Sequence, residues 1–90
     1  MMCGGFSEFK QVTEEELAIF KEATEGLLGV SYEPLIVAKQ IVAGTNYKFI
    51  CNATAITLHP QPYLAALTIF KPLPDAGDQR AILSDIHTVN

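Results

Sequence analysis

The sequence has few cysteines, few charged residues and no long apolar run, and each shortage excludes a class of protein. Two cysteines among 90 residues, Cys3 and Cys51, are too few for a disulfide framework. No run approaches the roughly 18 uninterrupted apolar residues of a membrane-spanning helix. The first residues also lack the basic start and apolar stretch of a signal peptide. We therefore expect a cytoplasmic protein that does not associate with membranes.

Positive charge is scarce. Six Lys and Arg residues oppose ten Asp and Glu residues, which gives a net charge of −4. Without a basic patch, nucleic acid and anionic membranes are not expected partners. An apolar fraction of 49% with only 18% charged residues excludes a disordered chain. The length and the absence of repeats or linkers predict a single domain over residues 1–90.

A capping-box pattern marks the start of the predicted helix. Thr13 is followed three residues later by Glu16, a spacing at which each side chain accepts the backbone N–H of the other residue. Apolar residues then recur with helical spacing from position 17 to position 28 and form one stripe for burial. We expect the helix to end near Leu28, with Gly29 as its C-cap.

Strand-like segments follow the predicted helix. β-branched and alternating residues predict strands over residues 35–42, 47–58, 63–71 and 81–89. Gly44, Pro60-Gln61-Pro62 and the Pro- and Asp-rich residues 72–78 predict the turns between them. A helix followed by four hairpin-connected strands is an α+β pattern, in which the helix packs on one face of an antiparallel sheet.

Two predicted turns carry apolar residues at the same end of this sheet. Successive hairpins of a meander point to alternate ends, so the turn at Ala43-Gly44 and the loop at Leu73-Pro74 are expected to be neighbours. Two interpretations are open. The tips form a ridge that enters the groove of another protein, or Ile41 and Val42 are inward-facing residues at the end of a strand. The pattern alone favours the second.

Three motifs resemble a known family. Gln40-Ile41-Val42-Ala43-Gly44, followed by Thr45-Asn46-Tyr47, resembles the Gln-x-Val-x-Gly signature of the cystatins, with Ile41 where Val is usual. The opening Met1-Met2-Cys3-Gly4-Gly5 resembles the start of the stefins, which are intracellular type 1 cystatins. Stefins also carry a Leu-Pro pair in their second inhibitory loop, where this chain has Leu73-Pro74. The resemblance covers nearly the whole chain.

The resemblance implies both a fold and a function. The fold is a five-stranded antiparallel sheet around one long helix, with the residues before the helix supplying the extra strand. The function is reversible inhibition of papain-like, cathepsin-like cysteine proteases by a protein that is not an enzyme and needs no cofactor or metal. The implied protease-binding residues are Gly4 or Gly5 in an N-terminal arm, Gln40, Ile41, Val42, Ala43 and Gly44 in the first loop, and Leu73 and Pro74 in the second.

The same residues allow other interpretations. A non-inhibitory module that binds another protein with the same scaffold is the alternative function. Cys51 with His59 or His87 offers a nucleophile and a base, but its place in a predicted strand is typical of a buried, inert thiol. Two His and two Cys without close ligand spacing predict no zinc site. We expect a monomer, with a domain-swapped dimer forming if the hairpin at Ala43-Gly44 opens.

Overall fold

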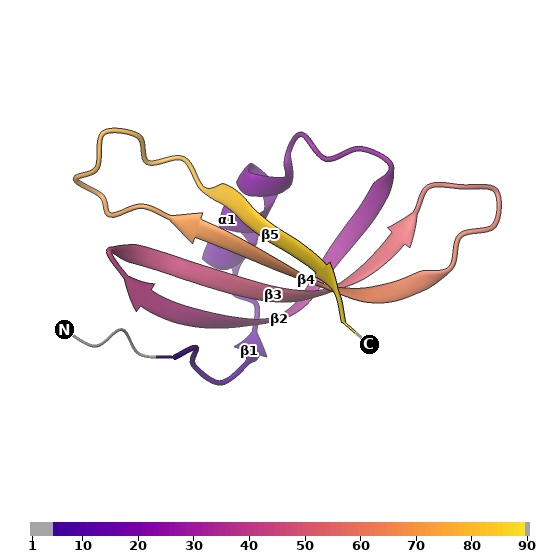
Figure 1. Ribbon diagram of the computed structural model, residues 1–90, viewed down its shortest axis with the longest axis horizontal. Helices are drawn as coiled ribbons and strands as arrows, with labels where there is room; N and C mark the ends of the chain where they lie inside the picture. Colours follow the sequence, from indigo (N-terminus) through magenta and orange to yellow (C-terminus); the bar gives the residue numbers. More distant parts are fainter. Residues whose placement is uncertain (1–4, 90) are drawn as a thin grey trace.

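The computed structural model describes residues 5–89, which form one helix and five strands (Figure 1). The elements are β1 Lys10–Gln11, α1 Glu14–Thr24, β2 Val30–Val42, β3 Gly44–Ala55, β4 Pro62–Lys71 and β5 Ile82–Thr88. The strands form one antiparallel sheet in the order β1-β2-β3-β4-β5. The predicted α+β meander is confirmed, including the additional strand before the helix. Within residues 5–89, no helix is long and apolar enough to cross a membrane.

The helix α1 begins where the sequence predicts. Thr13 Oγ1 accepts the backbone N–H of Glu16 at 3.2 Å, and Glu16 Oε1 accepts that of Thr13 at 2.9 Å. The predicted end near Leu28 is wrong, because the helix stops at Thr24 and spans only 11 residues. Gly26 disfavours another turn by about 1 kcal/mol relative to Ala. As a result, Leu28 is 91% exposed instead of lying in the buried stripe.

Gly29 leads the chain into the sheet and is not the helix C-cap, which is Glu25. Its φ of 88° lies in a region that glycine adopts without strain. The strand β2 begins directly afterwards, at Val30 and not at residue 35. It runs through Pro34, which has no N–H for the ladder. The register with β3 shifts between Pro34 and Ile36, and this irregularity accommodates the proline.

The other strand boundaries also differ from the predictions. Val42 pairs directly with Gly44, which leaves Ala43 at the tip of the β2–β3 hairpin. Because this hairpin closes so tightly, β3 begins at Gly44 instead of residue 47. It ends at Ala55 instead of residue 58, since the following residues turn toward Pro62. The strand β5 is one residue shorter at each end than the predicted 81–89.

The core lies between α1 and one face of the sheet (Figure 1). The ring of Phe20 on α1 meets that of Phe49 on β3 edge-on, with the ring centroids 4.9 Å apart. The largest fully buried side chains all lie on β3 and β4: Phe49, Cys51, Leu67 and Ile69. The predicted alternation of buried and outward residues in β3 is therefore confirmed. Because the helix α1 packs on the middle of the sheet, it does not cover the ends of the hairpins.

Candidate functional site

The two predicted loops lie at the same end of the sheet. Thr45, next to the β2–β3 turn, pairs with Lys71, the last residue of β4. The β4–β5 loop, residues 72–81, therefore leaves the sheet beside the tip at Ala43. The β3–β4 loop, residues 56–61, lies at the opposite end (Figure 1). We call the end that carries residues 40–44 and 72–81 the loop edge.

The N-terminal segment is anchored beside the loop edge. The strand β1 runs antiparallel to β2, so residues 5–9, which precede β1, run toward the tip (Figure 1). The backbone N–H of Ser7 donates to the carbonyl oxygen of Lys39 at 2.7 Å. The backbone N–H of Lys39 donates to Ser7 Oγ at 3.0 Å. Of the two predicted arm glycines, Gly5 is exposed with open space around it, and Gly4 lies outside the described residues.

A cation–π contact adds to this anchor. Lys48 Nζ on β3 lies 4.6 Å from the centre of the Phe6 ring, a distance typical of such contacts. Phe6 therefore lies over the face of the sheet that α1 does not cover, since Lys48 alternates with the buried Phe49. The N-terminal segment is held both by backbone bonds to β2 and by a side chain on β3.

Gly44 brings the β2–β3 hairpin into contact with the end of β4, where the β4–β5 loop begins. Its φ is 123°, and it is buried. A Cβ at this position would lie 2.6 Å from the carbonyl oxygen of Lys71 and 2.8 Å from the Phe70 ring. Only glycine meets both the conformational and the steric requirement. The tip of β2–β3 therefore packs directly on the end of β4, and the two loops form one continuous edge.

The loop edge presents apolar side chains to solvent. Ile41 is 65% exposed and Leu73 is 46% exposed. Ala43 and Pro74 are also exposed, whereas Val42 is half-buried. The interpretation of Ile41 as an inward-facing residue is therefore wrong, and Val42 is only partly covered. A group of exposed apolar side chains of this kind is typical of a surface that binds another protein.

Asn46 lies on β3 next to the loop edge and was not predicted from the sequence as a site residue. Its Nδ2 donates to Gln40 Oε1 at 3.0 Å, and the two residues pair across the hairpin. The bond restricts the Gln40 side chain at the base of the tip. The register of the β2–β3 hairpin could have identified Asn46 from the sequence as the partner of Gln40. Once Ala43 is placed at the tip, position 40 must oppose position 46.

A buried carboxylate lies under the anchored segment. Glu16 is 5% exposed, and its Oε2 lies 3.1 Å from Lys39 Nζ. Burial raises the pKa of Glu16, but the hydrogen bonds from Thr13 and Lys39 together outweigh it and hold the pKa below 4.5. The hydrogen bond to Glu16 raises the pKa of Lys39. The pair ties α1 to the stretch of β2 whose backbone holds Ser7.

Cys51 lies in the core, far from the loop edge along β3. Its side chain is fully buried, and burial raises its pKa to about 12. Its only hydrogen-bond partner among residues 5–89 is the Phe49 carbonyl oxygen. His59 is exposed in the β3–β4 loop, and His87 Nδ1 lies 2.9 Å from Asp85. Neither imidazole is positioned to deprotonate this thiol.

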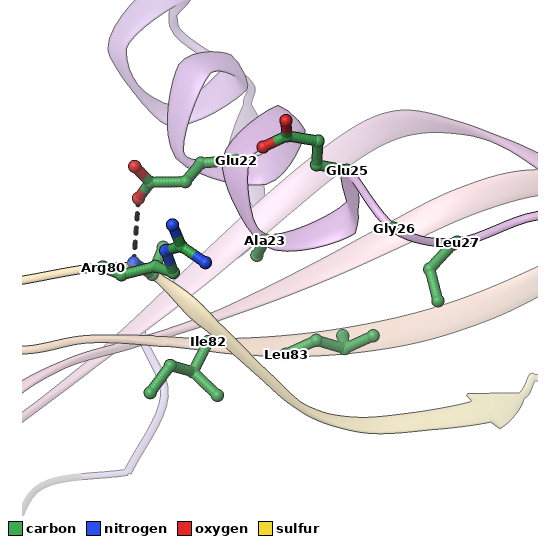
Figure 2. Close-up of a pocket in the computed structure, with 9 residues that line it drawn as sticks. Glu22, Ala23, Glu25, Gly26, Leu27, Arg80, Ile82 and Leu83 are labelled. Carbon is green, nitrogen blue, oxygen red and sulfur yellow. Dashed lines mark hydrogen bonds between the residues drawn. The ribbon is translucent and has the colours of Figure 1, made fainter.

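A pocket of about 730 Å³ lies between the end of α1 and the start of β5 (Figure 2). Glu22 and Glu25 line its helix side, and Arg80 and Leu83 line its strand side. None of the predicted site residues that the structure describes lines this pocket. Residues 5–89 also contain no cluster of three or more His, Cys, Asp or Glu side chains that could hold a metal ion.

Comparison of the chain with protein-family models, with curated proteins and with solved structures finds no match. What the protein does is therefore inferred from its own residues. The loop edge brings together residues 40–44 and the Leu73-Pro74 pair, with Gly5 on the segment anchored beside them. These are the described residues that were predicted from the sequence to bind a protease.

Proposed function

We propose that this protein is a reversible, non-covalent inhibitor of papain-like cysteine proteases with a cystatin-like fold of the stefin type. One observation carries the proposal: the hairpin tip at residues 40–44 and the Leu73-Pro74 pair are adjacent at one end of the sheet. They are far apart in the sequence, and the motif resemblance is what gives their adjacency a function. The anchoring of Ser7 to Lys39 supports the inclusion of the N-terminal segment.

Inhibition follows from the shape and polarity of the loop edge. A convex edge with Ile41 and Leu73 at its surface fills a V-shaped active-site cleft and excludes substrate from it. Burial of the exposed apolar surface drives association. A standard interface of about 800 Å² per partner is compatible with affinities from micromolar to picomolar. No bond with the protease nucleophile is required.

The same geometry protects the inhibitor from cleavage. Ile41 pairs with Thr45 and Val42 with Gly44, so the tip is a closed hairpin. A protease cleaves an extended segment laid along its cleft, and opening this hairpin would break its ladder bonds. The inhibitor acts as a monomer, because a dimer swapped at Ala43 would straighten the tip and remove the first loop.

The alternative function, a non-inhibitory protein-binding module, is favoured by a different surface. Leu28, Ile56 and Leu58 are 91%, 72% and 94% exposed. Their loops meet at the end of the sheet opposite the loop edge, where the backbone N–H of Ile56 donates to the carbonyl oxygen of Gly29. A partner bound at this end would leave the loop edge free.

Two matched substitutions distinguish the functions. Ile41→Asp introduces a charge into the loop edge, and Leu58→Asp introduces the same charge at the opposite end. Papain inhibition is expected to weaken at least about 100-fold with Ile41→Asp, because an unpaired charge is costly to bury. Inhibition by Leu58→Asp is expected to equal that of the wild type. Full inhibition by Ile41→Asp would contradict the proposed binding surface.

A further inference from the structure

The β4–β5 loop is held at both of its ends by one acidic residue of the helix. Glu22 Oε1 accepts the backbone N–H of Ala81 at 2.8 Å, at the end of the loop (Figure 2). Lys71 Nζ, at the start of the loop, lies 3.7 Å from the same oxygen. One carboxylate on α1 therefore fixes the two points between which residues 72–80 project.

Lys71 extends this anchor into the loop. Its Nζ also donates to the carbonyl oxygen of Gln79 at 2.6 Å. The side chain of Gln79 donates through Nε2 to the carbonyl oxygen of Pro74. The backbone N–H of Ala76 donates to the carbonyl oxygen of Leu73 at 3.0 Å. A continuous set of polar contacts thus connects Glu22 to the exposed Leu73-Pro74 pair.

We propose that Glu22 is a positioning residue for the second binding loop. It holds Leu73 and Pro74 in place through Lys71 and Ala81, without itself contacting the bound protease. This role rests on the proposed inhibitory function and adds to it a residue outside the cystatin-like motifs. Neither the helix pattern nor the loop motif identifies Glu22, because its bond to Ala81 joins positions 59 apart in the sequence.

The physical basis is preorganisation. Residues 72–81 contain no strand or helix, so a loop of this length without anchors samples many conformations. When only a fraction of molecules has the binding conformation, the apparent affinity falls by that fraction. Glu22 and Lys71 side chains are 44% and 33% exposed, and solvent weakens their ion pair. The hydrogen bond to the Ala81 N–H is therefore expected to provide most of the restraint.

Two substitutions separate the contributions of the charge and the hydrogen bond. Glu22→Ala removes both and is expected to weaken papain inhibition about fivefold to tenfold. Glu22→Gln keeps an acceptor for Ala81 and is expected to weaken inhibition by about threefold or less. It also provides a folded variant if Glu22→Ala does not fold.

Glu25→Ala is the matched control. Glu25 lines the same pocket near the end of the same helix (Figure 2). Its side chain makes no hydrogen bond or ion pair with any residue in the described part of the chain. Its replacement removes the same charge and is expected to leave the inhibition constant unchanged.

A double substitution distinguishes positioning from a general loss of stability. If Glu22 acts through Leu73, Glu22→Ala is expected to have less than about a twofold effect in a Leu73→Ala background. The experiment measures papain association and dissociation rates for the wild type, both Glu22 variants, Glu25→Ala, Leu73→Ala and the double variant. Hydrogen exchange at the Ala81 amide is also expected to be faster in Glu22→Ala.

The outcomes separate this role from the proposed function. The positioning role is overturned if the wild type inhibits papain and Glu22→Ala inhibits it equally well. It is also overturned if Glu22→Ala weakens inhibition by the same factor in the wild type and in the Leu73→Ala background. If the wild type leaves papain fully active, the proposed function is overturned and the role falls with it. A weaker Glu22→Ala variant whose effect disappears in the Leu73→Ala background supports the role.

Discussion

The carbonyl oxygen of Lys71 lies 2.6 Å from the position that a Cβ on Gly44 would occupy. This close approach places the first hairpin tip on the start of the second loop. The side chain of the same Lys71 reaches Glu22 on the helix. Lys71 is thus the point at which the tip, the loop and α1 meet.

Replacement of Gly44 by Ala is expected to destabilise the protein and disrupt the loop edge. The new Cβ would clash with Lys71 and Phe70, and the backbone would be strained at its positive φ. We expect a loss of about 2–4 kcal/mol in the free energy of unfolding, measured by urea denaturation. Gly26→Ala is the control, because a Cβ on Gly26 would meet no atom within 4 Å and its φ is not positive. Equal stability of the two variants would contradict the tight contact at Gly44.

Replacement of Asn46 by Ala is expected to impair inhibition more than stability. The change removes the hydrogen bond that restricts Gln40. We expect a cost of about 1 kcal/mol in stability and about tenfold weaker papain inhibition. Asn52→Ala makes the same chemical change on β3, away from the loop edge, and is expected to leave inhibition unaltered. If both variants inhibit like the wild type, the orientation of Gln40 is irrelevant to binding.

The charged pair of Glu16 and Lys39 predicts a dependence of stability on pH. Because the pKa of folded Glu16 lies below 4.5, the carboxylate contributes its full stabilisation above that pH. This contribution is lost as the pH falls through the lowered pKa. Glu16→Gln is therefore expected to be less stable than the wild type by about 1–2 kcal/mol at neutral pH. The difference is expected to shrink as the pH falls through this lowered pKa and the carboxylate of the wild type becomes protonated.

Urea denaturation at several pH values measures this effect. Glu14→Gln is the control, because Glu14 is exposed in the same first turn of α1 and its side chain makes no hydrogen bond or ion pair within residues 5–89. Its stability is expected to follow that of the wild type at every pH. A Glu16→Gln variant with the pH profile of the wild type would show that the pair does not stabilise the fold.

Removal of residues 1–5 is expected to weaken binding while leaving the fold intact. The bonds between Ser7 and Lys39 and the capping box at Thr13 all remain. Affinity differences among variants of one interface usually lie in the dissociation rate. We expect papain to dissociate faster from the truncated protein, with the urea midpoint unchanged. An unaltered dissociation rate would exclude the arm, including Gly4 and Gly5, from the interface.

Local signals predicted the parts of the fold that depend on neighbouring residues. The spacing of Thr13 and Glu16 fixed the start of α1, and alternation around Phe49 identified the buried face of β3. The rule that meander hairpins alternate in direction was enough to place the tip at Ala43 beside Leu73. These features required no knowledge of long-range packing.

The remaining features depend on competition between distant contacts. Apolar residues continue to Leu28, but the chain leaves the helix to begin β2 at Val30, whose pairing with Ala55 joins distant segments. The first long strand was predicted to begin at residue 35, yet a shift in register allows β2 to pass through Pro34. The contact of Glu22 with Ala81 has no sequence signature, because neither residue belongs to a motif.

Titration of papain of known active-site concentration tests the proposed inhibition most directly. With enzyme and inhibitor both at micromolar concentration, we expect activity to fall linearly and reach zero at one inhibitor per enzyme. Mass spectrometry of the recovered inhibitor is expected to show an intact chain, uncut between Ile41 and Val42. Undiminished activity at a molar excess of the protein, or its stoichiometric cleavage within residues 40–44, would contradict the account.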